Sequence, residues 1–360
     1  MKHGSMNRLG LAHRVMEWFE RDARDLPWRR KRTPYRVWLS EMMLQQTQVD
    51  TVIPYFKHFV ARFPTVKALA AAPLDEVLKV WEGLGYYARA RNLHRAAQIV
   101  SREWGGRFPK TVEGLIQLPG VGRYSAGAIA SLAFGVDAPV LDGNVIRVLC
   151  RVFVIERDPR EPKVRDELWS LAESLLPKGQ AGQFNEALME LGATVCLPRS
   201  PRCDACPIRS MCAARKRGIQ EQVPVRRVKK ITPHYDVTAA VIHRNGRILI
   251  AQRPHDGMLG GLWEFPGGKC EPGEPLADCL RREIREELEL EIEVGQSITS
   301  VKHAYSHFRI TLHAFECRVV SGRPKPIGVA DFKWVRMSEL DRFAFAVTDR
   351  KIIRAMTNVE

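Results

Sequence analysis

A glycine turn and an aspartate are the residues whose types and spacing could do chemistry in this chain. Residues 118–122 read Leu-Pro-Gly-Val-Gly, and the two glycines, Gly120 and Gly122, allow a tight turn whose backbone N–H groups face outward. Such a turn holds a phosphate group without a side chain. Asp142 follows twenty residues after Gly122, where a carboxylate would face a nucleotide gripped by the turn. Together with a basic chain, this arrangement predicts chemistry on DNA.

The elements that must position these groups are helices. Residues 117–119 end one helical pattern and residues 125–134 begin another, so the turn lies inside a helix-hairpin-helix. Apolar residues recur at helical spacing through most of the first part of the chain, which predicts an almost wholly helical region over 1–217. The periodic segments are 15–19, 37–44, 52–59, 93–100 and 168–175.

Glu41 is a candidate acid because of its neighbours. It lies in the apolar helix 37–44 beside Met42 and Met43, and apolar surroundings raise the pKa of a carboxylic acid and keep its proton available. The plain alternative for Glu41 is a glutamate on the surface of a helix. For Asp142 the alternative is the N-cap of a helix over 145–152, and this role is compatible with a catalytic one.

The charge of the chain indicates a nucleic-acid partner. The net charge is +15, yet residues 234–360 carry 18 basic and 18 acidic side chains. The whole excess therefore lies in residues 1–233, as binding to a phosphate backbone with release of counterions would require. The alternative is a basic surface that only keeps the protein soluble. The hydrophobic fraction of 45% argues against disorder.

Two negative features bear on location. The chain has no run of about eighteen apolar residues, so no transmembrane helix is expected. Residues 1–10 lack the apolar stretch of a secretory signal. We therefore expect a monomeric cytoplasmic protein that associates with double-stranded DNA and not with a membrane.

Four closely spaced cysteines predict a metal centre in the loop 196–212. Thiols at this spacing in a reducing compartment favour metal binding over disulfides. The paired Cys-x2-Cys knuckles usual for zinc are absent, whereas each cysteine of a [4Fe–4S] cluster need only reach one iron. We expect the cluster rather than zinc, with a structural role in holding a basic loop against DNA; a redox role stays open. The four are Cys196, Cys203, Cys206 and Cys212.

A change of pattern separates two domains. Residues 218–233 lose the amphipathic period, contain two prolines and four closely spaced cations, and read as an extended basic linker. Beyond it, segments 237–243, 247–251 and 313–318 read as strands and 276–288 as one helix. The prediction is a multidomain protein: an all-α domain over 1–217, the linker, and an α/β domain over 234–360.

The motifs together resemble a known family. Residues 1–217 resemble the helix-hairpin-helix DNA glycosylases related to endonuclease III, and most closely the MutY family of adenine DNA glycosylases. The C-terminal half, which is Nudix-like and similar to MutT, also belongs to that family's layout, so the resemblance covers essentially the whole chain. The matching segments are 38–49, 83–94, the hairpin, 141–144, 184–187 and the cysteine loop.

The resemblance implies roles for five residues. Glu41 would protonate adenine N7 and later activate water, and Asp142 would stabilise the oxocarbenium ion, which fits the charges that develop when an N-glycosidic bond breaks. Tyr124, Asn144 and Glu186 match positions that support this pair. Bifunctional relatives carry a lysine where this chain has Tyr124, and tyrosine cannot form an imine. The expected activity is therefore monofunctional excision of adenine opposite 8-oxoguanine or guanine, and the alternative is a thymine or uracil mismatch glycosylase.

The resemblance also implies the DNA contacts. The target base must be flipped out of the duplex, and Gln46 and Tyr86 match positions that enter the stack. Plain core aromatics are the alternative for Tyr86 and Tyr87. A loop of Tyr305, Ser306 and His307 would read 8-oxoguanine, since a hydroxyl can both donate and accept. The hairpin residues expected at the DNA are Leu118, Gly120, Val121 and Gly122.

The C-terminal domain keeps most of a Nudix box. Gly268, Glu274 and the run 282–287 fit this pattern, with Glu289 in place of its last glycine. Glu283, Glu286 and Glu287 fall on one face of a helix, which suits Mg²⁺ bridging a pyrophosphate. Nucleoside-triphosphate pyrophosphatase activity is thus a second, minor prediction. An acidic surface helix without chemistry is the alternative.

Overall fold

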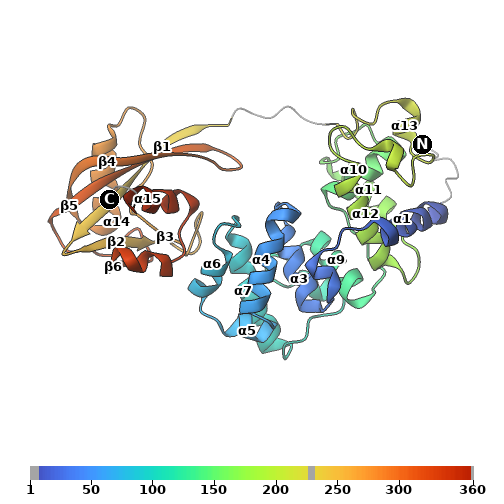
Figure 1. Ribbon diagram of the computed structural model, residues 1–360, viewed down its shortest axis with the longest axis horizontal. Helices are drawn as coiled ribbons and strands as arrows, with labels where there is room; N and C mark the ends of the chain where they lie inside the picture. The colour runs from blue at the N-terminus through green and yellow to red at the C-terminus, as the bar shows by residue number, and fades with distance from the viewer. Residues whose placement is uncertain (1–7, 226–231, 358–360) are drawn as a thin grey trace. The chain divides into compact units, whose positions relative to one another are not determined.

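The computed structural model describes residues 8–225 and 232–357 (Figure 1). The contacts group the chain into two compact units, Met1–Ala70 with Arg95–Val228 and Ala71–His94 with Lys229–Glu360. Among the described helices, none is both long enough and apolar enough to cross a membrane.

The first unit is helical, as its periodicity predicts. Each of the periodic segments 15–19, 37–44, 52–59 and 93–100 lies inside a helix, and 168–175 ends one residue beyond α11. The helices are α1 (Arg8–Asp22), α2 (Pro27–Arg30), α3 (Pro34–Leu44), α4 (Val49–Arg62), α5 (Val66–Ala71), α7 (Ala88–Glu103), α8 (Val112–Ile116), α9 (Arg123–Phe134), α10 (Gly143–Phe153), α11 (Pro162–Ser174), α12 (Ala181–Thr194), the 3₁₀ turn Cys203–Ala205 and α13 (Ala213–Arg217). α5 and α7 continue past the boundaries of the unit.

The predicted helix-hairpin-helix consists of α8, the turn and α9. Gly120 has a φ of 79°, a left-handed conformation that glycine adopts without strain. Gly122 is the N-cap of α9 and supplies no side-chain cap, so the first turn of α9 keeps backbone N–H groups available to an anion. Leu118 and Val121 are buried, so their side chains anchor the turn and only their backbone could reach DNA.

α10 and α12 pack closely in the core of the first unit. Their apolar residues join those of α1 and α11 in one buried cluster. A Cβ added to Gly192 of α12 would lie 2.5 Å from Cβ of Asn144, so the absence of a side chain at Gly192 allows α12 to approach the start of α10. This approach brings two helices with functional residues together.

The second unit contains one mixed sheet and two covering helices. Its strands are β1 (His234–Arg244), β2 (Arg247–Gln252), β3 (Trp263–Glu264), β4 (Glu291–Ala304), β5 (Arg309–Ser321) and β6 (Asp331–Val335), in the order β3-β2-β1-β5-β4 with β6 paired to β2. β1 and β5 run parallel, and the other pairs are antiparallel. α14 (Leu276–Leu288) packs on one face of the sheet and α15 (Val347–Thr357) on the other.

A helical segment from the middle of the chain belongs to this second unit. α6 (Leu74–Trp81) and the residues after it are grouped with Lys229–Glu360. Glu82 accepts hydrogen bonds from Arg350 Nε at 2.6 Å and from the Phe345 backbone N–H at 2.9 Å. The domain boundary at 217 expected from the sequence does not anticipate this grouping.

The linker differs from its prediction where it is described. Ile219 to Gln222 form a turn, and Val223 is buried in the core of the first unit rather than extended in solvent. The four linker cations, Arg226, Arg227, Lys229 and Lys230, lie outside the described residues.

Candidate active site

Glu41 is a buried acid and not the surface glutamate of the alternative interpretation. It lies on α3, only 6% exposed. Its pKa is raised to about 7, mainly by burial and in part by the negative charges of Asp142 and Glu186, whereas a hydrogen bond from Tyr124 opposes the rise. Tyr124 Oη donates to Glu41 Oε2 at 2.8 Å. The carboxyl can therefore hold a proton near neutral pH.

Asp142 is the N-cap of α10, so this part of the prediction is confirmed. Its Oδ1 accepts the backbone N–H of Val145 at 2.7 Å, and its Oδ2 accepts Nδ2 of Asn144 at 2.8 Å. Burial raises the pKa of Asp142, and these donors together with Arg147 oppose the rise by stabilising the charged form. Asp142 is thus better suited than Glu41 to act as a carboxylate.

Both acids face one cavity of about 510 Å³. Tyr124, Asn144 and Glu186 line the same cavity, so the structure brings together all five catalytic candidates of the sequence. The size is within the range usual for small-molecule sites, and a purine base fits this range. A protonated acid and a hydrogen-bonded carboxylate at one cavity are the pair that cleavage of a glycosidic bond needs.

An ion-pair wall that the sequence reasoning missed borders this cavity. On α12, Glu186 accepts from Arg29 Nε at 2.7 Å and from Arg32 Nη2 at 2.5 Å. One turn later, Glu190 accepts from Arg24 Nε at 2.6 Å and from Arg29 Nη2 at 3.0 Å. The i, i+4 spacing of the two glutamates on an otherwise apolar helix was the available signal.

The four cysteines line one small pocket together with Arg151. None forms a disulfide. The pKa values of Cys203, Cys206 and Cys212 are raised, to about 12 for Cys206, mainly by burial and in part by neighbouring thiols, so thiolates here need a positively charged partner. Arg151 Nη1 lies 3.2 Å from Cys196 Sγ, a contact that suits a ligating thiolate.

The four thiols lie around one pocket, which suits a group that contains several metal atoms. Across residues 8–225 and 232–357, no three His, Cys, Asp or Glu side chains converge to hold a single metal ion. The cysteines of a cluster bind separate irons and need not converge on a point.

A chain of hydrogen bonds connects this loop to Asp142. Arg147 donates through Nε to the Cys196 carbonyl and through Nη2 to Oδ1 of Asn144, both at 2.7 Å. Asn144 in turn donates to Asp142. The loop therefore helps to orient the carboxylate as well as to present basic side chains.

The two residues expected to enter the DNA stack share an unusual backbone. Gln46 has a φ of 59° and Tyr86 a φ of 50°, left-handed conformations that are strained for residues other than glycine. Gln46 is exposed and lines the cavity, and Tyr86 is 46% exposed. The core interpretation is therefore wrong for Tyr86, whereas its neighbour Tyr87 is buried.

The expected lesion-reading loop is the tip of the β4–β5 hairpin. The Tyr305 backbone N–H donates to the Phe308 carbonyl at 2.8 Å, and the rings of these residues pack at 4.9 Å. Ser306 and His307 are exposed at the tip. Within the second unit, Ser306 Oγ lies 3.0 Å from Tyr86 Oη, so this unit joins two residues expected at the DNA.

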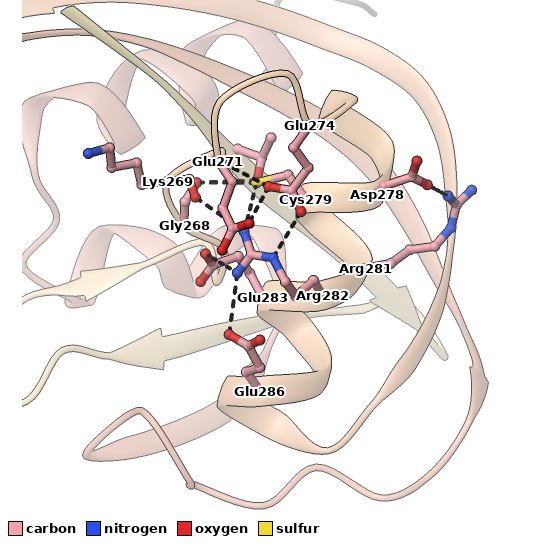
Figure 2. A network of polar contacts seen from close by, with 11 residues as sticks. Gly268, Lys269, Glu271, Glu274, Asp278, Cys279, Arg281, Arg282, Glu283 and Glu286 are labelled. Carbon is pink, nitrogen blue, oxygen red and sulfur yellow. Dashed lines mark hydrogen bonds and ion pairs between the residues drawn. The ribbon is translucent and has the colours of Figure 1, made fainter.

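The Nudix-type glutamates are arranged around an arginine. Figure 2 shows Arg282 between Glu274, Glu283 and Glu286, with contacts of 2.9, 2.8 and 3.3 Å. Glu287 lies apart from this network, with Oε2 buried and unpaired, in a second cavity of about 360 Å³. Because no metal-binding group converges in the described residues, Mg²⁺ at this helix stays a prediction.

Glu289 occupies the position of the missing Nudix glycine. It caps α14 in a left-handed conformation with a φ of 53°, which glycine would adopt without strain. Its carboxylate pairs with Lys325 at 2.7 Å.

Three family models match the chain. The model of the HhH-GPD superfamily of base excision DNA repair proteins matches residues 39–174. The iron–sulfur binding domain of endonuclease III matches residues 196–212, so the expected cluster site is confirmed and zinc is not supported. The NUDIX domain model matches residues 237–355.

Curated relatives match nearly the full chain. The human adenine DNA glycosylase is 38% identical over 94% of this chain and 72% of its own length. The adenine DNA glycosylase of Schizosaccharomyces pombe is 31% identical over 96% of this chain and 89% of its own length. That of Buchnera aphidicola from Acyrthosiphon pisum is 36% identical over 85% of both.

Solved structures match the helical part. A thermostable thymine-DNA glycosylase is 30% identical, with a TM-score of 0.53, over 58% of this chain and 97% of its own. Endonuclease III in a non-covalent DNA complex shares the fold, with a TM-score of 0.50 and 24% identity over 58% of this chain and 95% of its own.

Proposed function

Since this chain belongs to the adenine DNA glycosylase family, we propose that it excises adenine mispaired with 8-oxoguanine or guanine in duplex DNA, leaving an abasic site. The observation that carries the proposal is the pair of acids at one cavity: Glu41, with its pKa raised to about 7, and Asp142, hydrogen-bonded at a helix N-terminus. The HhH-GPD and iron–sulfur matches support a DNA repair enzyme.

Glu41 begins the reaction as the acid. With adenine flipped into the cavity, its proton passes to N7 of the base, which makes the base a better leaving group. Tyr124 holds Oε2 of Glu41 and so orients the carboxyl. After the bond breaks, the ionised Glu41 accepts a proton from the attacking water.

Asp142 stabilises the sugar while the bond breaks. The sugar becomes an oxocarbenium ion, and a fixed carboxylate lowers the energy of that charge. Val145 and Asn144 hold the carboxylate, so it needs no reorganisation during the reaction. Tyr124 cannot form an imine with the sugar, so the strand stays intact.

The DNA is bound by several elements of the chain. The hairpin Gly120–Gly122 and the start of α9 bind a backbone phosphate, and Gln46 and Tyr86 fill the space that the flipped base leaves. Ser306 and His307 read 8-oxoguanine at the tip of the β4–β5 hairpin. Cys196, Cys203, Cys206 and Cys212 hold a [4Fe–4S] cluster, which keeps its loop folded. The domain organisation from the sequence, 1–217, 218–233 and 234–360, is part of this proposal.

The experiment is a base-release assay with excess protein. Labelled duplexes carry adenine opposite 8-oxoguanine, adenine opposite thymine, or thymine opposite guanine, and each product is examined with and without hot alkali. Cleavage at adenine only after alkali, fastest opposite 8-oxoguanine, is expected. Loss of thymine opposite guanine would instead place the chain with the thymine glycosylases, and cleavage without alkali would contradict the monofunctional mechanism.

A further inference from the structure

Glu190 is the most completely enclosed charged group at the catalytic cavity. Its side chain is only 2% exposed. Its Oε1 accepts from Nε and from the backbone N–H of Arg24, at 2.6 and 3.2 Å, and its Oε2 accepts from Arg24 Nη2 at 2.9 Å and from Arg29 Nη2 at 3.0 Å. One carboxylate thus fixes two guanidinium groups that line the cavity.

Arg29 makes Glu190 part of the environment of Glu41. Its Nε bonds to Glu186 and its Nη2 to Glu190, so a single guanidinium is shared between the two carboxylates. Arg29 is also held by the Arg24 carbonyl, which accepts from Nη1 at 2.8 Å, and by the ring of Phe19 at 4.9 Å. Fixed charges of both signs therefore stand in defined places on the cavity wall.

The charges on this wall bear on the proton of Glu41. Three arginines, Arg24, Arg29 and Arg32, line the cavity. Their cations would favour the ionised form of a nearby acid, whereas carboxylates favour the protonated form. The carboxylate of Glu186 has this effect on Glu41 and raises its pKa. Without Glu190, Arg29 would keep Glu186 as its carboxylate partner, and Arg24 would lose the carboxylate that its guanidinium contacts.

We propose that Glu190 is a positioning residue for excision: it holds Arg24 and Arg29 in place and balances their charge, so that Glu41 keeps its proton at neutral pH. The proposal deepens the proposed function and rests on it. Excision of adenine by the unaltered protein tests that premise separately.

The test is the pH profile of single-turnover excision by Glu190→Gln, which keeps the shape and removes the charge. Uncompensated cations lower the pKa of Glu41, so the rate should begin to fall at a pH lower by at least about half a unit. At pH 8 the loss should be at least about threefold, and near pH 6 it should be less than about twofold. An equal loss at every pH, or no loss, would overturn the proposal.

Two further variants keep the test decisive. In Glu190→Asp the charge remains, so the profile should return toward that of the unaltered protein even if the rate is lower. Arg24→Gln combined with Glu190→Gln removes both members of the ion pair. It should move the alkaline limb of the pH profile back to higher pH, toward that of the unaltered protein. If Glu190→Gln shifts the alkaline limb and neither variant returns it toward that of the unaltered protein, the proposal is overturned. If Glu190→Gln does not fold, a limb at lower pH than that of the unaltered protein in either of these variants would overturn it.

Asp158→Asn is the matched control in the first unit. Asp158 is also buried, and its two carboxylate oxygens accept hydrogen bonds from the guanidinium group of Arg160. It does not line the catalytic cavity. Its pH profile should overlay that of the unaltered protein. If the alkaline limb of Asp158→Asn shifts as far as that of Glu190→Gln, the loss of any buried ion pair has this effect, and the proposal is contradicted.

Discussion

Two glutamates in different units of the molecule have the same raised pKa and different surroundings. Burial raises the pKa of Glu41 in the first unit and of Glu287 in the second to about 7. Glu41 receives a hydrogen bond from Tyr124 and shares its cavity with the carboxylate of Asp142. Glu287 lies among further acids, Glu264 and Asp349, whose pKa values burial also raises, to about 8 and 6.

This difference teaches that a raised pKa alone does not identify a catalytic acid. In the first unit Glu41 can keep a proton near neutral pH, whereas at Asp142 hydrogen-bond donors and Arg147 oppose the rise in pKa that burial causes. The two acids therefore differ and can act on a bond from two sides. In the second cavity the pKa values of all three acids are raised. This favours the protonated form, which binds a cation poorly. Arg282 in turn pairs with Glu283 and Glu286.

The largest effect is expected from Asp142→Asn. Loss of the charge that stabilises the oxocarbenium ion should slow single-turnover excision by at least about 10²- to 10³-fold while duplex binding persists. Asp349→Asn is the matched change in the second unit, since Asp349 is buried and, like Asp142, accepts a backbone N–H, that of Phe265. Excision from an adenine–guanine duplex should be unchanged in Asp349→Asn. An equal loss in both variants would remove the distinction between the two cavities.

A smaller effect is expected from Ser306→Ala combined with His307→Ala. Loss of these polar groups should reduce the preference for adenine opposite 8-oxoguanine over adenine opposite guanine by about tenfold. The ratio of the two single-turnover rates measures this preference. If the ratio stays the same, the β4–β5 tip has no part in reading the lesion.

Tyr124→Phe should change the rate at neutral pH only a few-fold, and its signature is in the pH profile. The hydrogen bond from Tyr124 lowers the pKa of Glu41, so its removal raises that pKa. Since the reaction needs protonated Glu41, the alkaline limb of the excision rate should move to higher pH. A limb that moves to lower pH would show that Glu41 is not the acid being titrated.

The smallest effect on catalysis is expected from Arg282→Gln in the Nudix helix. The substitution leaves three carboxylates without their shared cation, which should lower the thermal midpoint by about 2–4 °C. Excision opposite guanine should be unaffected, because the network in Figure 2 has no member in the first unit. A strong loss of that excision in a folded protein would link the Nudix helix to the chemistry.

The sequence was sufficient where function depends on local pattern. The cysteine spacing, the hairpin glycines and the apolar neighbours of Glu41 are all readable along the chain, and helix 276–288 coincides with α14. The spacing of Glu186 and Glu190 was readable, but their arginine partners were not, because Glu190 and Arg24 meet across 166 positions and neither carries a local signal of the other.

The strands were the least predictable part of the fold. β4 is largely exposed and polar, with shifts of register against β5, so it lacks a clean alternation of apolar residues. β3 has only two residues, and β6 is short. α15 was missed as well, and its first turn follows an apolar segment without a capping signal.

The most direct test of the account is a side-by-side measurement of single-turnover adenine excision by Glu41→Gln and Glu287→Gln on one duplex with adenine opposite 8-oxoguanine. The account predicts that Glu41→Gln loses at least about 10³-fold in rate while still binding the duplex, and that Glu287→Gln stays within about twofold of the unaltered protein. Excision that persists in Glu41→Gln, or that is lost in Glu287→Gln, would contradict it.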